Sequence, residues 1–194
     1  MPPVLPEVLE RCGYEFDSSF TAGDVLSNFP YALSRGLGMT EDTSLYEFPV
    51  TLEDEEAPGL PGHVDKDLDV IEANAGNGAI SVLLVHPNDP KHKVAAEERL
   101  IKRLPVGVRA SDLITFARYW RARDRARWAV EPTRDPSEWT LTVQVDEPVN
   151  GLTFEFQRHL MTVQGMAGLR VEPYRLILPA LNPGEAVLSL RYAP

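Results

Sequence analysis

The spacing of apolar residues changes near residue 126, and this change constrains the fold more than any other feature. Before it, short apolar runs alternate with helical segments, an order typical of βα units and a parallel sheet. After it, six short runs, separated by turn residues, occupy fewer than seventy residues without a helical segment: "RWAVEP", "WTLTVQV", "GLTFEFQ", "HLMTVQG", "LRVEPYRLIL" and "AVLSLRYA". This pattern predicts a small antiparallel sandwich. We therefore predict an α/β domain over residues 1–125 and an all-β domain over residues 126–194.

Three short strands are expected in the α/β domain, at "YEFDSS", "LYEFPVTL" and "AISVLLV". The last is a continuous apolar run closed by turn residues, which predicts a buried strand of a parallel sheet. Helical periodicity is expected over residues 5–12, 65–76, 94–104 and 111–123. The stretch from Phe20 to Ser44 is expected to be irregular.

Polar side chains follow each of these strands. Asp17 and Ser18 follow the first strand, Asp54 follows the second, and His86 and Asn88 follow the third. Because the carboxyl ends of parallel strands meet at one edge of a sheet, we expect these side chains to gather there. A carboxylate beside an imidazole orients and charges it, which suits proton transfer.

Structural interpretations of the same residues stay open. A lone histidine at a strand end commonly caps a loop, and the acidic run "EDEE" (residues 53–56) is typical of a solvated loop. Asp17 can form an Asx-turn with Ser19. The other histidines carry no catalytic pattern, and we expect His63 and His92 to be exposed.

Composition excludes several classes of protein. The formal net charge is −10, which disfavours binding to a nucleic-acid phosphate backbone. The single cysteine, Cys12, excludes an intrachain disulfide and a cysteine-based zinc site. No apolar run approaches the length of a membrane span, and no secretory signal opens the sequence, so the sequence does not indicate a cellular location.

Three segments in this order, "VLERCGYEFDSSFTA", "YEFPVTLEDE" and "ISVLLVHPND", resemble the carboxyl-terminal half of a NodB-type polysaccharide deacetylase domain. The resemblance covers roughly residues 4–122. It implies a partial (β/α) barrel and metal-dependent hydrolysis of acetyl groups on a carbohydrate substrate, with zinc as the expected divalent metal. It also implies that His86, held by an acidic neighbour, protonates the leaving group. Asp54, or failing that Glu53, is the expected neighbour, and Asp17, Ser18 and Asn88 are the expected substrate-binding residues.

The early motifs of that family are absent from the sequence. These are the Thr-Phe-Asp-Asp segment, with the catalytic base and one metal ligand, and a histidine-rich segment with the other two ligands. We therefore expect no metal to bind this chain alone. We expect the chain to be the downstream part of a longer protein, inactive alone, that either lacks its N-terminal half or self-associates.

A second hypothesis is a non-catalytic glycan-binding or scaffold module with a deacetylase-like fold. The aromatic residues of the all-β domain would then contact a glycan or a partner: Trp128, Trp139, Phe154, Phe156, Tyr174 and Tyr192. The alternative for these side chains is a place in the sandwich core.

Overall fold

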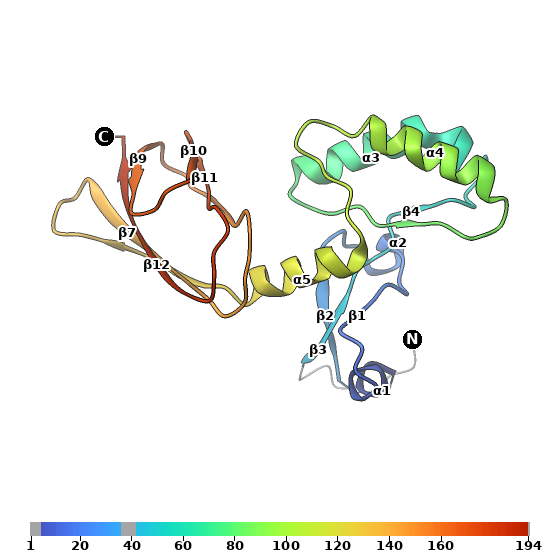
Figure 1. The fold of residues 1–194 in the computed structure, drawn as a ribbon, viewed down its shortest axis with the longest axis horizontal. Helices are drawn as coiled ribbons and strands as arrows, with labels where there is room; N and C mark the ends of the chain where they lie inside the picture. Colours follow the sequence, from blue (N-terminus) through green and yellow to red (C-terminus); the bar gives the residue numbers. More distant parts are fainter. Residues whose placement is uncertain (1–4, 36–41, 194) are drawn as a thin grey trace. The chain divides into compact units, whose positions relative to one another are not determined.

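The structure is a computed structural model that describes residues 5–35 and 42–193. It divides between Ser111 and Asp112 into an N-terminal α/β unit and a C-terminal antiparallel β unit (Figure 1). The sequence pattern predicted a boundary at residue 125. The difference is helix α5 (Leu113–Asp124), which belongs to the C-terminal unit because Tyr119 and Ala122 pack into that unit's core.

The N-terminal unit contains four helices and five short strands among its described residues. In chain order these are α1 (Leu5–Arg11), β1 (Phe16–Asp17), α2 (Ala22–Val25), β2 (Tyr31–Ser34), β3 (Asp42–Glu47), β4 (Leu52–Glu53), α3 (Leu60–Gly76), β5 (Leu83–Leu84) and α4 (Pro90–Lys102). The strands form one three-stranded sheet, in the order β1-β3-β2, and one two-stranded sheet of β4 and β5. Across the described residues these strands do not close into a barrel.

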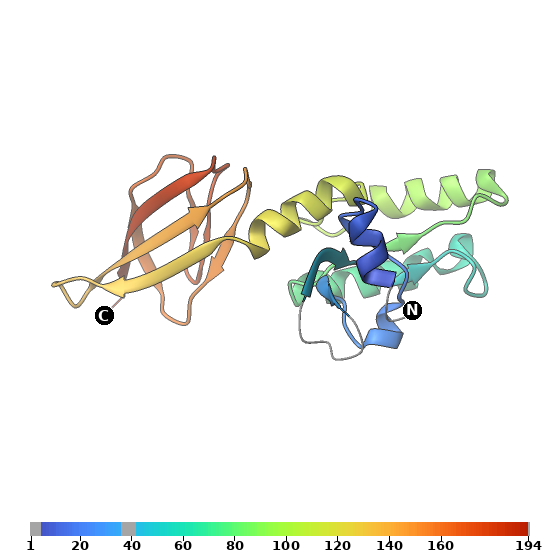
Figure 2. The same cartoon turned by 90° about the horizontal axis from the view of Figure 1, so that it is seen from below.

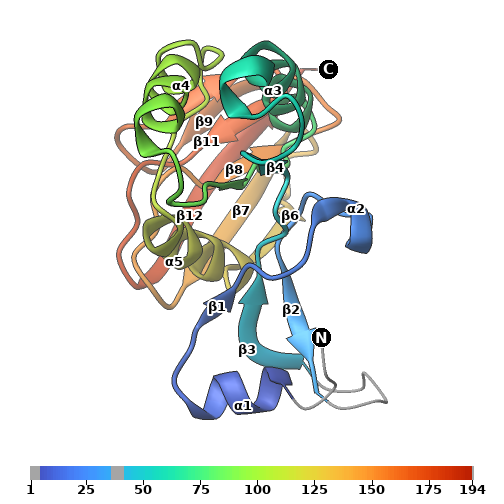
Figure 3. The ribbon, with the colours of Figure 1, turned by 90° about the vertical axis from the view of Figure 1, so that its right-hand side faces the viewer.

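The three-stranded sheet is mixed. Strand β1 runs parallel to β3, with Asp17 opposite Glu47, and β2 runs antiparallel to β3, with Tyr31 also opposite Glu47 (Figure 3). The prediction that residues 20–44 are irregular was therefore wrong where the structure describes them, since they contain α2, β2 and the start of β3. Short elements of this kind depend on pairing with β3, which local periodicity does not reveal.

The two-stranded sheet is parallel, with Leu52 opposite Leu83. Helices α3 and α4 lie side by side (Figure 1). Together with β4 and β5 they contribute to one apolar core. This core contains Leu52, Leu60, Val64, Ile71, Ala96 and Leu100. The prediction of a buried strand at residues 79–85 was only partly right, because β5 has two residues and Leu84 is 38% exposed.

Over its described residues, the C-terminal unit contains α5 and seven strands. The strands are β6 (Arg127–Pro132), β7 (Glu138–Val145), β8 (Thr153–Glu155), β9 (Leu160–Gln164), β10 (Arg170–Glu172), β11 (Arg175–Ile177) and β12 (Gly184–Tyr192). They form two antiparallel sheets, in the orders β6-β7-β12-β9 and β10-β11-β8 (Figure 2). Each predicted run contains at least one of these strands, and residues 139–192 contain no helix.

Alternation along the strands explains how the two sheets share one core. In β7, Leu141, Val143 and Val145 are buried, whereas the residues between them are partly exposed. Leu188 and Leu190 of β12 repeat this pattern beside them. Because successive side chains of a strand point to opposite faces, one face of this sheet is apolar and packs against Leu176 and Leu178 of the segment at β11.

Gly165, which follows β9, is expected to be the glycine of the C-terminal unit that tolerates substitution least. Its φ is +119°, and a Cβ there would lie 2.5 Å from the backbone carbonyl oxygen of Val187. We expect Gly165→Ala to lower the free energy of unfolding by about 2–4 kcal/mol, from backbone strain and overlap together. Gly151→Ala is the control, because Gly151 has a φ of +81° but open space around it. Urea unfolding followed by tryptophan fluorescence measures the free energy of unfolding of both variants. Equal losses of stability would contradict the role assigned to the close approach between the added Cβ and the Val187 carbonyl oxygen.

Candidate functional site

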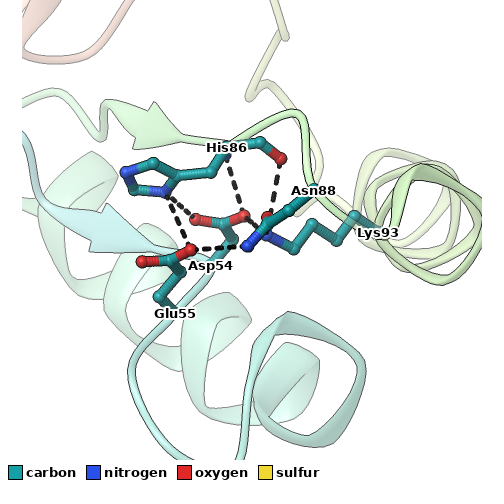
Figure 4. A network of polar contacts seen from close by, with 5 residues as sticks. All are labelled: Asp54, Glu55, His86, Asn88 and Lys93. Carbon is teal, nitrogen blue, oxygen red and sulfur yellow. Dashed lines mark hydrogen bonds and ion pairs between the residues drawn. The ribbon is translucent and has the colours of Figure 1, made fainter.

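His86 and Asp54 form the centre of the candidate site, at the carboxyl ends of the parallel strands β5 and β4. The imidazole Nδ1 of His86 lies 2.7 Å from Oδ1 of Asp54 (Figure 4). The backbone N–H of His86 donates to the other oxygen, Oδ2, at 2.9 Å. Asp54 therefore holds both the ring and the main chain of His86, and it, rather than Glu53, is the orienting carboxylate.

The carboxylate of Asp54 is completely buried in the structure. Burial by itself opposes ionisation, but the hydrogen bonds from Lys93 and His86 outweigh it and hold the pKa of Asp54 well below its usual range. Asp54 is therefore a fixed negative charge beneath the imidazole at any pH near neutrality.

Lys93, in the first turns of α4, supplies the compensating positive charge. Its ammonium contacts Oδ2 of Asp54, donates to Oδ1 of Asn88, and donates to the backbone carbonyl of His86 at 3.4 Å (Figure 4). Lys93 is itself buried. A buried ion pair needs additional hydrogen bonds to offset the loss of water, and Asn88 and the His86 carbonyl provide them.

Glu55 and Asn88 form the outer part of this network. The side-chain amide of Asn88 donates to Oε1 of Glu55 at 2.9 Å, and the same oxygen lies 3.9 Å from Nδ1 of His86. Asn88 therefore joins the loop after β5 to the loop after β4.

His86 is partly exposed, in contrast to the buried Asp54 and Lys93. Its side chain is 41% exposed, and with Nδ1 held by Asp54, the other ring nitrogen, Nε2, points away from the carboxylates (Figure 4). The hydrogen bond to Asp54 raises the pKa of His86, with a smaller contribution from the charge of Glu55. The imidazole is therefore biased toward its protonated form and presents one N–H to whatever binds beside it.

The structure brings together three of the five residues that the sequence predicted, namely Asp54, His86 and Asn88. It gives Ser18 and Asp17 other partners. The hydroxyl of Ser18 donates to the backbone carbonyl of Phe48 at 2.6 Å, and Asp17 accepts from the hydroxyl of Ser19 at 2.9 Å. The last contact joins the two residues of the expected Asx-turn, but it is made by the Ser19 hydroxyl, because the backbone N–H of Ser19 donates to Glu47 instead.

Asp17 lies instead opposite buried Glu47 in the three-stranded sheet, and partly buried Tyr31 also lies opposite Glu47. Glu47 accepts from the backbone N–H groups of Ser19 and Phe20 at 3.1 and 3.0 Å. Its Oε2 and the Oδ2 of Asp17 are buried and have no hydrogen-bond partner among the described residues. Burial raises the pKa of Glu47, and the charge of Asp17 adds to the effect. The pKa of Tyr31 is also raised, first by burial and then by the charges of Glu47 and Asp17.

We expect Glu47→Gln to stabilise the protein at pH 7. A carboxyl group whose pKa is raised on folding stabilises the fold fully below its unfolded pKa and loses that contribution as the pH rises through the folded pKa. Glutamine keeps the acceptor for the two backbone N–H groups and removes the buried charge, which favours folding by roughly 1 kcal/mol. Thermal unfolding at pH 7 and pH 4 measures the gain, which should be larger at pH 7. Exposed Glu55→Gln is the control, and a gain that does not depend on pH would contradict the explanation.

Lys93 belongs to the network although the sequence pattern did not indicate it, and His63 is buried although it was expected to be exposed. Lys93 was left outside a helix expected from residue 94, although Pro90 after Asp89 is a usual start for a helix. The prediction that His63 is exposed was wrong, because α3 begins at Leu60 and turns His63 inward, where its Nδ1 lies 2.8 Å from Asp67. His92 is exposed, as predicted.

The described residues do not fit the divalent metal that the family resemblance implies. Over residues 5–35 and 42–193, no three histidine, cysteine, aspartate or glutamate side chains are grouped so that they could hold a metal ion. The carboxylate of Asp54 is already committed to Lys93 and His86. In the same part of the chain, none of the helices has both the length and the apolar character to span a membrane.

Comparison of the chain with protein-family models, with curated proteins and with solved structures gave no significant match.

Proposed function

We propose that this chain is part of a hydrolase that removes acetyl groups from a carbohydrate, with His86 as its general acid and Asp54 as the residue that positions His86. The observation that carries the proposal is the His86–Asp54 pair, in which a buried carboxylate holds Nδ1 and leaves Nε2 directed outward. The resemblance of three ordered segments to NodB-type deacetylases supplies the substrate class.

The role of His86 follows from its protonation. When water adds to the acetyl carbonyl and the bond to the sugar nitrogen or oxygen breaks, the departing atom needs a proton. The imidazolium donates it from Nε2, acetate and the free sugar amine or hydroxyl leave, and His86 regains a proton from solvent. Asp54 stays ionised throughout, because its pKa is far below neutrality, and it stabilises the imidazolium.

We do not propose that His86 or Asp54 activates the attacking water. The described part of the chain offers no group of metal ligands, and we therefore place no step of the reaction on a metal. We propose that the ligands implied by the resemblance lie outside the described residues, in an N-terminal half of a longer polypeptide.

Acetate release from N-acetylated and O-acetylated oligosaccharides tests the proposal. It should be measured, with added zinc or cobalt, on the 194-residue chain and on the polypeptide obtained by reading the coding sequence upstream of Met1. We expect release from the longer polypeptide only. An upstream sequence without a Thr-Phe-Asp-Asp-like segment, or a longer polypeptide that releases no acetate, would contradict the proposal.

A glycan-binding role is the second candidate, and a groove in the C-terminal unit favours it. This role needs no catalytic group and can accompany the hydrolase activity or stand alone.

A further inference from the structure

The C-terminal unit contains an open groove of about 670 Å³, a volume in the range of small-molecule sites. The groove lies where strand β6, at the edge of one sheet, meets strand β8, at the edge of the other. Its lining comes from these two edge strands, from β7 and β12, from the loop after β8 and from the end of α5. All of these residues belong to one compact unit, so the groove is a property of that unit alone.

Several aromatic rings line the groove. Tyr192 meets Trp139 and Phe156 edge to face, with ring centroids 6.2 and 5.9 Å away. Tyr192 is buried and packs in the core, which accounts for part of this cluster as ordinary sandwich packing.

Trp128 differs from these rings, because it is 61% exposed. It lines the groove from β6 and meets Phe154 of β8 edge to face, with centroids 5.8 Å apart. The contact holds the indole in place while much of its surface remains in water. A large aromatic surface that is fixed but uncovered is a platform for a ligand with an apolar face.

Trp139, which lines the groove, carries a hydrogen-bond donor that is not used among the described residues. The indole Nε1 of Trp139 is buried and has no hydrogen-bond partner within the part of the chain that the structure describes. A buried indole N–H is normally paired. Trp139 lines the groove, so a small rotation of its ring toward the groove would let an acceptor on a bound molecule supply the partner.

Charged side chains of both signs surround the aromatic surface. Arg123 and Arg158 are balanced by Asp124 and Glu155. The guanidinium of Arg158 lies 4.9 Å from the centre of the Tyr192 ring, which fixes its position. The lining therefore has no net charge and offers both donors and acceptors.

We propose that this groove binds a neutral carbohydrate, with a pyranose ring stacked on Trp128 and a hydroxyl or acetamido oxygen accepting from Nε1 of Trp139. A pyranose presents an apolar C–H face and a rim of groups that both donate and accept hydrogen bonds, which matches the lining. A hydrocarbon ligand would leave Nε1 of Trp139 unpaired, and a lining without net charge does not favour a phosphorylated ligand. The proposal concerns binding by the C-terminal unit and does not depend on catalysis at His86.

Tryptophan fluorescence and calorimetric titration of the 194-residue chain test the proposal. The probes are the β-1,4-linked hexamers of N-acetylglucosamine, glucose and xylose, with the apolar dye ANS as a separate arm. We expect at least one hexamer to bind, and Trp128→Ala to weaken its binding about tenfold or more. Tyr174→Ala is the matched control, because Tyr174 is 57% exposed in the same unit but does not line the groove.

A second variant separates this inference from the proposed function. His86→Ala should bind the hexamer as tightly as the unchanged chain, whatever its effect on acetate release. Binding that survives Trp128→Ala, equal losses in Trp128→Ala and Tyr174→Ala, or binding of ANS with no binding of any hexamer would each overturn the inference.

Discussion

Replacement of His86 by alanine is expected to lower acetate release by about 10²–10⁴-fold, the usual contribution of a general acid. The expectation applies to the longer polypeptide that carries the rest of the proposed site. The loss should appear in kcat, because the imidazolium acts on the departing atom during bond cleavage and not in the binding of the sugar. Measurement of kcat and KM on an acetylated oligosaccharide checks it.

The control for this variant is His92→Ala, since His92 is an exposed histidine on α4 with no part in the network. It should retain full activity. A loss in His86→Ala no larger than in His92→Ala would contradict the general-acid role.

The pH profile gives an independent readout of Asp54 as a positioning residue. The hydrogen bond to Asp54 raises the pKa of His86, so activity should persist upward in pH until the imidazolium loses its proton. Asp54→Asn weakens this effect and should move the alkaline limb of the profile to lower pH. An unchanged alkaline limb would show that Asp54 does not act through His86.

Asp54→Asn is also expected to lower the free energy of unfolding of the N-terminal unit by roughly 3–5 kcal/mol, the cost of breaking a buried ion pair. The change leaves the ammonium of Lys93 buried without its carboxylate, because Lys93 has only Asn88 and the carbonyl of His86 as its other partners in the network. Urea unfolding should be followed by far-ultraviolet circular dichroism. Circular dichroism reports on this unit because it contains helices α3 and α4. Tryptophan fluorescence would report on the C-terminal unit, because all three tryptophans of the chain lie after residue 111.

The size of this loss should depend on pH. The low pKa of Asp54 stabilises the fold above the unfolded value near 3.9, and this contribution is lost as the pH falls through the folded pKa. The raised pKa of His86 contributes below the unfolded value near 6.5 and is lost as the pH rises through the folded pKa. The difference between the variant and the unchanged chain should therefore be largest between about pH 4 and pH 6.5.

Glu55→Gln is the matched control, because Glu55 belongs to the same network but its side chain is half exposed. Exposed ion pairs contribute about 0–1 kcal/mol, so its loss should stay within that range. Equal losses for Asp54→Asn and Glu55→Gln would contradict the importance assigned to the buried charge.

The direction of two strands was enough to predict the centre of the site from the sequence. A polar residue after each of two parallel strands is enough to bring Asp54 and His86 to one edge, and they meet there. Asn88 follows because it is two residues from His86. Asp17 could not be excluded in the same way, since the sequence does not reveal that its strand belongs to a separate sheet, paired with β3 rather than with β5.

The sequence by itself determined the type of most elements, the two-part organisation, and the antiparallel strands of the C-terminal unit, because these follow from the local period of apolar residues. Only the tertiary structure decided which polar groups are buried. It turned Lys93 and Asp54 inward, buried Glu47 and His63, and left Trp128 largely exposed. It also left the indole N–H of Trp139 without a partner in the described part of the chain. Burial depends on how elements distant in the sequence pack together. Burial and neighbouring charge set the pKa values on which the proposed role of His86 depends. Burial also leaves unpaired, among the described residues, the indole donor of Trp139, on which the carbohydrate proposal depends.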